Sequence, residues 1–394
     1  MKRIWRGLVA ALIAASTVAA PQPAAADGAT ATPYAGTGDA GYSGDGGPAA
    51  AAALNKPGGV AVGPGGVVYL ADTENWVVRA ISADGVITTV AGRGRSGPDA
   101  PETPLTGDAE VPASETTLRY PSSVAVGPTG SVYIGDSGNA RILSMSPDGA
   151  VSLVAGGNGV GFSGDGGPAV DAQLRDVGGI EVEADGAVIF GDLRNYRIRR
   201  IAADGVIDTL VGSGDVGVLA SGEAGSFTFP YGPLSTATGP GADRWVASNL
   251  LYNMSGTRLR AAVRDGNGRW SAAEPEGATI PAGVWRGTLH VAATGNAVYL
   301  SGDDGLYRLY PDGRFETLLA NPSIVGPLAM VDDHIGYLAD SRSNRLYRLD
   351  LPPLADADPS GDDAWWRQWW VLAIVVVLAA GLVVAVLVSR RRRG

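Results

Sequence analysis

The chain has 394 residues, a formal net charge of −10 at pH 7 and no cysteine. Disulfides and cysteine-based metal sites are therefore excluded, and the fold must be held together by its own core. Between residues 27 and 364, 40 acidic residues stand against 22 basic ones, which disfavours nucleic acid and other polyanions as partners.

The N-terminal segment is typical of a secretory signal peptide. Lys2, Arg3 and Arg6 precede an apolar run from Leu8 to Ala20, and three alanines at Ala24–Ala26 follow. This order of charged, apolar and small residues marks a leader that is removed on export. We expect residues 1–26 to be a signal peptide and residues 27–352 to form the exported domain.

Three ungapped copies of one 39-residue unit come next, starting at Leu54, Leu118 and Leu174. Each copy contains four short runs rich in β-branched residues, separated by turn signals such as "GPGG" and "ADG", which predicts an antiparallel meander. A single four-stranded sheet cannot bury both faces. The copies should therefore stack around an axis as blades of a β-propeller.

Three weaker copies complete the predicted ring. They start near Gly232, near Asn296 and near Gly326, and the last contains only three strands. The missing strand is supplied by Thr32–Gly36, because closure by both termini removes free sheet edges, and Pro33 suits an edge strand. The prediction is an all-β, six-bladed β-propeller with four-stranded blades. Seven blades would require the poorly patterned stretch 221–281 to contain two.

The repeats resemble those of NHL-repeat β-propellers. The resemblance is carried by "P-x-G-V-A-V", "G-x-V-Y-x-A-D-x-x-N" and "D-G-x-I-T-T-V-A-G", together with long "SGDGGPA" connectors that are similar to those of exported bacterial proteins and of teneurins. A bacterial source also fits 28 arginines against two lysines. The resemblance implies a six-bladed propeller and leaves the function open, because propellers serve both as binding proteins and as enzymes.

A glycine-rich stretch, "GYSGDGGPAA" at Gly41 and "GFSGDGGPAV" at Gly161, recurs before two of the repeats. A phosphate loop would need a following Lys and Ser or Thr, and a calcium loop would need more carboxylates. We interpret the stretch as a connector and keep a cation site as the lesser alternative. Pro48 and Pro168 should open a short helix, with Asp45 and Asp165 accepting hydrogen bonds from its free N–H groups.

A second recurring motif, D-x-x-N-x-R, ends the second strand of each repeat, with Val77 in place of the arginine in the first repeat and Asp340, Ser343 and Arg345 as a looser copy. We expect Asx-type turns. In a meander these turns and the connectors share one face of the disc, where a ligand would dock. The candidate residues on this face are Tyr42, Asp45, Asp72, Asn75, Asp136, Asn139, Phe162, Asp165, Asp192 and Asn195.

The central channel offers little chemistry. The inner strands read "VAV", "VAV" and "IEV", so Glu181 and His290 are the channel candidates, with Glu183 as a further carboxylate. No serine has a nucleophile-elbow context. We expect no catalytic residue and no cofactor. A metal-dependent lyase or lactonase with a divalent cation near Glu181 and His290 is the alternative.

Four aromatic residues, Trp245, Tyr252, Trp270 and Trp285, lie where the repeat pattern is weakest. They either fill the wedges between irregular sheets or form a ligand surface.

The C-terminal segment is typical of a single membrane anchor. An uncharged run covers Trp369–Val388, with tryptophans at one boundary and Arg390–Arg393 at the other. Twenty apolar residues match a bilayer core, and the arginines favour the cytoplasmic side. We expect an acidic stalk at 353–364, a transmembrane helix at 365–389 and a tail at 390–394.

These features predict a single-pass type I membrane protein whose propeller binds an extracellular protein or glycan at the cell surface. The identity of the ligand and the oligomeric state stay open.

Overall fold

The computed structural model describes residues 28–94, 105, 109–217, 221–229, 232, 234–239, 244–247, 251–255, 258–264, 270–272, 289–303, 305–311, 314–320 and 324–355. The expected signal peptide, transmembrane helix and tail, and most of the stalk, lie outside these residues. Within them, no helix is long and apolar enough to cross a bilayer. The chain divides into two units, Met1–Pro353 and Leu354–Gly394, and every described strand belongs to the first.

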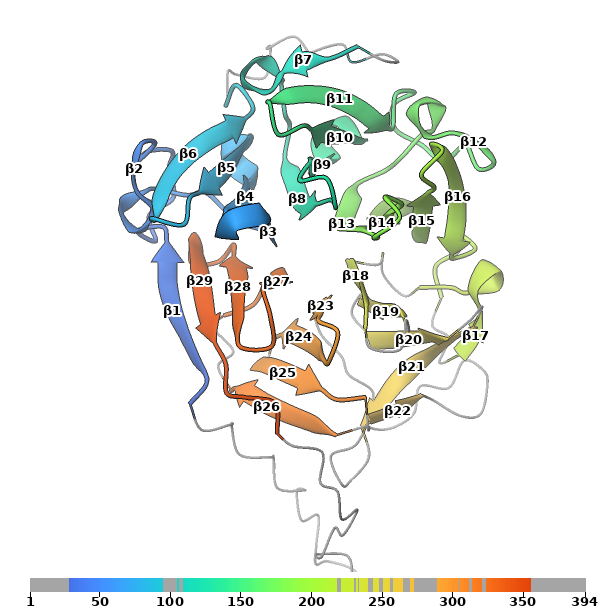
Figure 1. Cartoon of the computed structure of the whole chain (residues 1–394). Coiled ribbons are helices and arrows are strands. Elements are labelled where there is room, and N and C mark those ends of the chain that lie inside the picture. Colours follow the sequence, from blue (N-terminus) through green and yellow to red (C-terminus); the bar gives the residue numbers. More distant parts are fainter. Residues whose placement is uncertain are drawn as a thin grey trace, which may run out of the picture. The chain divides into compact units, whose positions relative to one another are not determined.

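The first unit is an all-β propeller whose described strands form six antiparallel sheets (Figure 1). Each of the three strong repeats supplies four consecutive strands of one sheet, as its hydrophobic alternation predicts. These strands are β3 (Pro57–Val62), β4 (Val68–Asp72), β5 (Val77–Ile81) and β6 (Val86–Ala91); β8 (Pro121–Val126), β9 (Val132–Asp136), β10 (Arg141–Met145) and β11 (Ala150–Ala155); and β13 (Val177–Val182), β14 (Val188–Asp192), β15 (Arg197–Ile201) and β16 (Val206–Val211).

The prediction of four strands for these repeats was wrong by one strand. The connector that leads into each repeat adds a two-residue strand to the outer edge, paired with the fourth strand of that repeat. The sheet order is therefore β2-β6-β5-β4-β3 in the first repeat. The added strands are β2 (Gly47–Pro48), β7 (Val111–Pro112) and β12 (Gly167–Pro168). Proline is tolerated there because an edge strand needs no further partner.

The weaker repeats supply the remaining three sheets. The fourth sheet contains β17 (Ser221–Glu223), β18 (Ser235–Thr238), β19 (Arg244–Ala247), β20 (Leu251–Ser255), β21 (Arg258–Arg264) and β22 (Trp270–Ala272). The fifth contains β23 (His290–Ala293), β24 (Val298–Gly302), β25 (Gly305–Leu309) and β26 (Phe315–Leu319). The sixth, the closing sheet, contains β27 (Leu328–Met330), β28 (Ile335–Asp340), β29 (Arg345–Asp350) and β1 (Thr30–Ala35).

Strand β1 closes the ring. It pairs antiparallel with β29, from Thr30 opposite Asp350 to Ala35 opposite Leu346, and it lies at the outer edge of the sheet. The inner strands β3, β8, β13, β18, β23 and β27 contact one another in that order, and β27 contacts β3. The N-terminal strand that the sequence predicts thus completes the sheet in which the chain ends.

The hydrophobic core lies between neighbouring sheets. Leu54, Leu118 and Leu174, which end the connectors, are fully buried or nearly so and pack with the β-branched residues of adjacent strands. Burial of a leucine side chain contributes about 1.5–3 kcal/mol, so each connector is anchored at the point where its repeat begins.

Two of the four aromatic residues in the weaker repeats belong to the core. Trp245 is buried with Leu289 and Leu300. Tyr252 is fully buried and packs edge-on against Phe227 and Phe229, with ring centroids 5.1 and 5.8 Å away. These two residues therefore fill space between sheets and form no ligand surface. Trp285 lies outside the described residues, and Trp270 is described only as part of β22.

A glycine follows the fourth strand of each strong repeat because no side chain fits there. Gly92, Gly156 and Gly212 have φ of 98°, 91° and 109°. A Cβ atom at these positions would lie 2.6, 2.3 and 2.3 Å from the carbonyl oxygens of Trp76, Ala140 and Tyr196. The glycine in "VAG" therefore allows the connector to leave the sheet directly over the turn between strands two and three.

We expect Gly156→Ala to lower the free energy of unfolding by about 3 kcal/mol, because it combines a strained φ with a backbone clash. Gly149→Ala is the matched control, since Gly149 has a φ of 88° with no atom within 4 Å of the Cβ position, and should cost only about 1 kcal/mol. Denaturant unfolding of both variants measures the difference; equal losses would contradict this account.

Candidate functional site

The connectors and the D-x-x-N turns meet on one side of the ring. We call this surface the connector face and define it by residues 36–56, 119–120, 156–176 and 212–217 with the turns 72–76, 136–140 and 192–196. The contacts between the two motifs are direct. Asn75 donates to the Gly41 carbonyl at 2.7 Å, and Asn195 donates to the Gly161 carbonyl at the same distance.

The aspartate of each turn is fully buried. Asp72 Oδ1 accepts the Asn55 backbone N–H at 2.7 Å, and Asp72 Oδ2 accepts the Asn75 amide at 2.8 Å. Burial raises the pKa of Asp72 to about 6, against the opposing effect of these hydrogen bonds and of Arg79. The expected Asx-type turn was wrong for Asp72, because the backbone N–H that it accepts belongs to Asn55, 17 positions earlier, and no side-chain cap holds the turn itself. The carboxylate therefore holds the end of its connector.

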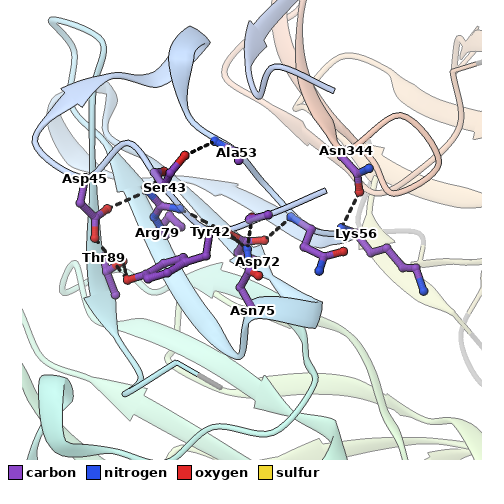
Figure 2. A network of polar contacts seen from close by, with 12 residues as sticks. Tyr42, Ser43, Asp45, Ala53, Lys56, Asp72, Asn75, Arg79, Thr89 and Asn344 are labelled. Atoms are coloured by element: carbon purple, nitrogen blue, oxygen red, sulfur yellow. Dashed lines mark hydrogen bonds and ion pairs between the residues drawn. The ribbon is translucent and has the colours of Figure 1, made fainter. Parts of the chain in front are cut away.

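A fully buried arginine joins this aspartate to the glycine-rich connector (Figure 2). Arg79 extends from β5, with Nη1 3.4 Å from Asp72 Oδ2 and Nη2 2.7 Å from Asp45 Oδ1. The Nη2 group also donates to the Ser43 carbonyl at 3.1 Å. The guanidinium thus fixes both the backbone and the acidic side chain of the connector.

The third repeat contains the same clamp. Arg199 is fully buried, 2.6 Å from Asp165 Oδ1 and 3.4 Å from Asp192 Oδ2, and donates to the Ser163 carbonyl at 3.1 Å. Burial raises the pKa of Asp192 to about 6 as well. Two connectors 120 residues apart in the sequence are therefore held by one geometry.

The second repeat neutralises its aspartate differently. Arg141, two positions earlier than the clamp arginine, places Nε 2.8 Å from Asp136 Oδ2 and donates to the Thr117 carbonyl at 2.9 Å. Asn139 donates to the same carboxylate oxygen at 2.9 Å. Burial raises the pKa of Asp136. Leu143 occupies the position that corresponds to Arg79.

The predicted helix caps in the connectors were wrong. Pro48 and Pro168 precede the 3-10 turns Ala49–Ala51 and Ala169–Asp171, and no side chain caps these turns. Asp45 and Asp165 bind arginine because a buried guanidinium needs a counter-charge, whereas the N–H groups of a single 3-10 turn do not.

An aromatic ring lies over each clamp arginine at the surface. The Tyr42 ring centroid is 5.1 Å from Arg79 Cζ, and its hydroxyl lies 2.8 Å from Thr89 Oγ1. The Phe162 ring centroid is 3.7 Å from Arg197 Cζ and 5.0 Å from Arg199 Cζ. These cation–π contacts hold the rings in place, while Tyr42 remains 51% and Phe162 40% exposed.

Exposed apolar side chains gather on the connector face. Among the described residues, six large apolar side chains are exposed, and five of them are on this face: Tyr42, Tyr120, Val160, Phe162 and Val216. The sixth, Val331, follows β27, in the turn before β28, at the opposite ends of the strands. Among the described residues, most of the exposed large apolar side chains therefore lie on one side of the ring.

A cavity of about 420 Å³ lies among the inner strands of all six sheets, and both channel candidates line it. Glu181 is not free there: Arg244 Nη1 lies 2.5 Å from Oε2, and Thr236 and the Thr238 N–H also donate to its carboxylate. Glu183 pairs with Arg200 at 3.2 Å and Arg244 at 2.6 Å. The channel carboxylates are therefore neutralised by arginine.

The channel hydroxyls link neighbouring sheets. Thr73 donates to the Pro121 carbonyl at 2.7 Å, Ser122 to the Val177 carbonyl at 2.6 Å and Ser123 to the Gly178 carbonyl at 2.7 Å. Each of these bonds joins one sheet to the inner strand of the next. The polar character of the channel wall thus serves ring assembly.

His290 lines the same cavity, and none of the hydrogen bonds described for Glu181 involves it. Burial lowers the pKa of His290 to about 4, with Asp303 opposing the shift, so the imidazole is neutral at pH 7. Among the described residues, no group of three or more His, Asp or Glu side chains is arranged to hold a metal ion.

The clamp arginines are not apparent from the D-x-x-N-x-R motif, which points to a different arginine. Arg79 and Arg199 lie seven positions after Asp72 and Asp192, in the two repeats preceded by "SGDGGP". The second repeat has a divergent connector, "TGDAEVP", and Leu143 at this position. The arginine and the "SGDGGP" connector are thus present together in two repeats and absent together in the second. This covariation is the sequence signal that could have revealed the clamp.

Residues 18–159 match the Teneurin NHL domain family. The chain contains an NHL-type β-propeller. Teneurin-1 of Gallus gallus is 24% identical over 378 residues, covering 76% of this chain and 13% of that protein. Teneurin-m of Drosophila melanogaster is 32% identical over 120 residues, covering 30% of this chain and 4% of that protein. The NHL propeller thus spans a small part of these relatives.

A gluconolactonase from Xanthomonas campestris superimposes with a TM-score of 0.50 at 14% sequence identity, covering 76% of this chain and 87% of that chain. At this level of identity the similarity shows a shared propeller fold and leaves the chemistry open.

We expect Arg79→Met to lower the free energy of unfolding by about 3–5 kcal/mol, because it leaves the Asp72 carboxylate buried without its counter-charge. Adding Asp72→Asn should restore much of this loss, since the amide carries no charge. Lys56→Met is the control: its ion pair with Glu74 is 61% exposed on the lysine side and should change stability by less than about 0.5 kcal/mol. A cost for Arg79→Met no larger than the control would refute the clamp.

His290 should make the protein sensitive to acid. Because its folded pKa is about 4, below the ordinary 6.5, its contribution to stability is complete above pH 6.5 and is lost as the pH falls through 4. His290→Gln should reduce this loss by up to about 3 kcal/mol. Unfolding of both proteins between pH 7 and 4 measures the effect; parallel curves would show that His290 is solvated.

Proposed function

We propose that this protein is a non-enzymatic recognition module and that the connector face binds its partner. The observation that carries the proposal is the exposure of Tyr42, Tyr120, Val160, Phe162 and Val216 on one side of the ring, on a face whose two glycine-rich connectors are held by buried arginines. Rigid loops lose little conformational entropy on binding, and aromatic anchors contribute much of the energy of protein interfaces.

An extracellular protein fits this face better than a glycan. Val160 and Val216 are 66% and 62% exposed, and burial of such aliphatic side chains is favourable against apolar groups of a partner. Sugar recognition depends on free hydrogen-bonding groups. Here Asp45, Asn75 and Asp165 already bind arginine or backbone within the protein.

We propose no catalytic role and no cofactor for the channel. A lyase or lactonase would need several convergent acid, base or metal-ligating groups there. Both oxygens of Glu181 accept hydrogen bonds from Arg244, Thr236 and Thr238, which leaves His290 as the one channel candidate that is not held in this way. The hydroxyls of Thr73, Ser122 and Ser123 are likewise used between sheets.

The full architecture that we propose is an exported six-bladed ring on a single membrane anchor. Residues 1–26 direct export, residues 365–389 cross the membrane and residues 353–364 form the stalk, as the charge and hydropathy of these segments suggest. The propeller would then face the cell exterior.

In-cell photo-crosslinking of the full-length protein tests the recognition surface. A photo-reactive residue at Phe162 or Val216 should capture a discrete protein, because both side chains are exposed on the connector face. The same residue at Val331, which is 49% exposed, and at Pro147, in the turn before β11, provides matched controls away from that face.

An adduct from the connector face alone supports the proposal. Equal capture from all four positions, or from the controls alone, would refute the assignment of the face. No protein adduct anywhere would favour a glycan or small ligand, and hydrolysis assays with lactones would then test the enzyme alternative.

A further inference from the structure

A fourth buried aspartate occupies the clamp position but has no clamp arginine. In the closing sheet Asp340 ends β28 and faces Arg345 across the turn, as Asp72 faces Val77 in the first repeat. Leu338 faces Tyr347, as Leu70 faces Arg79. The two hairpins have the same register, so Tyr347 stands where the guanidinium of the first repeat originates.

Asp340 is fully buried, yet one of its oxygens has no hydrogen-bond partner. Oδ1 accepts the Arg342 N–H at 3.0 Å, whereas Oδ2 is buried without a donor in the described structure. The corresponding oxygens of Asp72 and Asp192 each accept hydrogen bonds from an asparagine and an arginine. A buried charged oxygen without a partner is strongly unfavourable.

The arginines closest in sequence are bound elsewhere. Arg345 donates to the Thr37 carbonyl at 2.6 Å, and Arg342 forms an ion pair with Asp303 at 3.0 Å. Ser343 replaces the asparagine of the other turns, and the Tyr347 hydroxyl donates to Ser343 Oγ at 3.4 Å. Ser343 and Tyr347 thus place two hydroxyl groups on the same hairpin as the Asp340 carboxylate, and carboxylate and hydroxyl oxygens are hard donors.

We propose that a monovalent cation, Na⁺, binds at Asp340 in place of the guanidinium. A single positive charge balances the single buried carboxylate at this site, whereas Arg79 and Arg199 each pair with a buried aspartate and a connector aspartate. A divalent ion would leave a net positive charge in a buried site, which is costly, and Ca²⁺ takes six to eight oxygen ligands with more carboxylates. The charge of the site thus selects the class of ion.

The reason for the exchange lies in the connectivity. Arg79 also holds Asp45 and Ser43 of the connector that leads into its sheet. Only residues 320–327 separate β26 from β27, too few for a glycine-rich connector of that kind, and β1 supplies the edge strand instead. Because no such connector enters the closing sheet, a positive charge at Asp340 is sufficient there, and a side chain long enough to contact a connector is not required.

Thermal unfolding of the full chain in detergent, titrated with NaCl while choline chloride keeps the ionic strength constant, tests the site. Sodium should raise the Tm saturably by about 2–4 °C, because it binds only the folded state. Asp340→Asn should abolish the response. Tyr347→Arg should also abolish it and should match or exceed the Tm of the wild-type protein in sodium, because it restores the clamp.

A wild-type Tm that does not respond to sodium would overturn the proposal and leave a proton or a water molecule at Asp340. An equal response in all three proteins would reveal a general salt effect and overturn it as well. If Asp340→Asn fails to fold, ²³Na NMR line broadening of the wild-type chain, absent in Tyr347→Arg, distinguishes site binding independently of stability.

Discussion

Full burial of an aspartate at the end of the second strand is the constraint on which most of this structure depends. A buried carboxylate without compensation is strongly unfavourable, and each of the three strong repeats places an arginine beside its own. In the first and third repeats the compensating arginine is long enough to reach the connector as well. Charge neutralisation and loop fixation are therefore one interaction, because the buried guanidinium that pairs with the turn aspartate also binds a carbonyl and a carboxylate of the connector.

Variation around this constraint explains the differences among the sheets. Arg141 approaches Asp136 from a position two residues earlier, and the second connector has a different sequence. Asp340 retains the aspartate in a sheet closed by the N-terminal strand, where no glycine-rich connector enters and Tyr347 replaces the arginine. The same register thus occurs with an arginine that reaches the connector, with an arginine two residues earlier and, among the described residues, with no arginine at the aspartate of the closing sheet.

The inner strands impose a second constraint, which limits the chemistry of the channel. Inner strands from six sheets contact one another in a circle, and their backbone polar groups must find partners in the neighbouring sheet. Thr73, Ser122 and Ser123 meet this need, and Glu181 is held by Arg244. The channel groups thus stabilise the ring, and the surface that we propose for recognition is the connector face, where Tyr42 and Phe162 lie over the clamp arginines.

Much of the fold could be predicted from local pattern, because alternation of β-branched residues and turn signals acts over a few residues. This local pattern was sufficient to predict the 39-residue period, the closing strand at Thr32–Gly36 and the common face of connectors and turns. The extra strand at Gly47–Pro48 could not be predicted in this way, since two residues have no period. The role of Asp45 was also misjudged, because its partner, Arg79, is 34 positions away and arginine on a strand is ordinarily solvated.

Local residue order was enough to set the repeat, the placement of glycines that no other residue could replace and the position of each aspartate, since these depend on backbone conformation and on neighbours within one hairpin. Packing between sheets was needed to settle which charges are buried, which of them pair and which aromatic rings stay exposed. Those outcomes depend on where segments distant in the chain exclude water, and desolvation has no signature in a single stretch of residues.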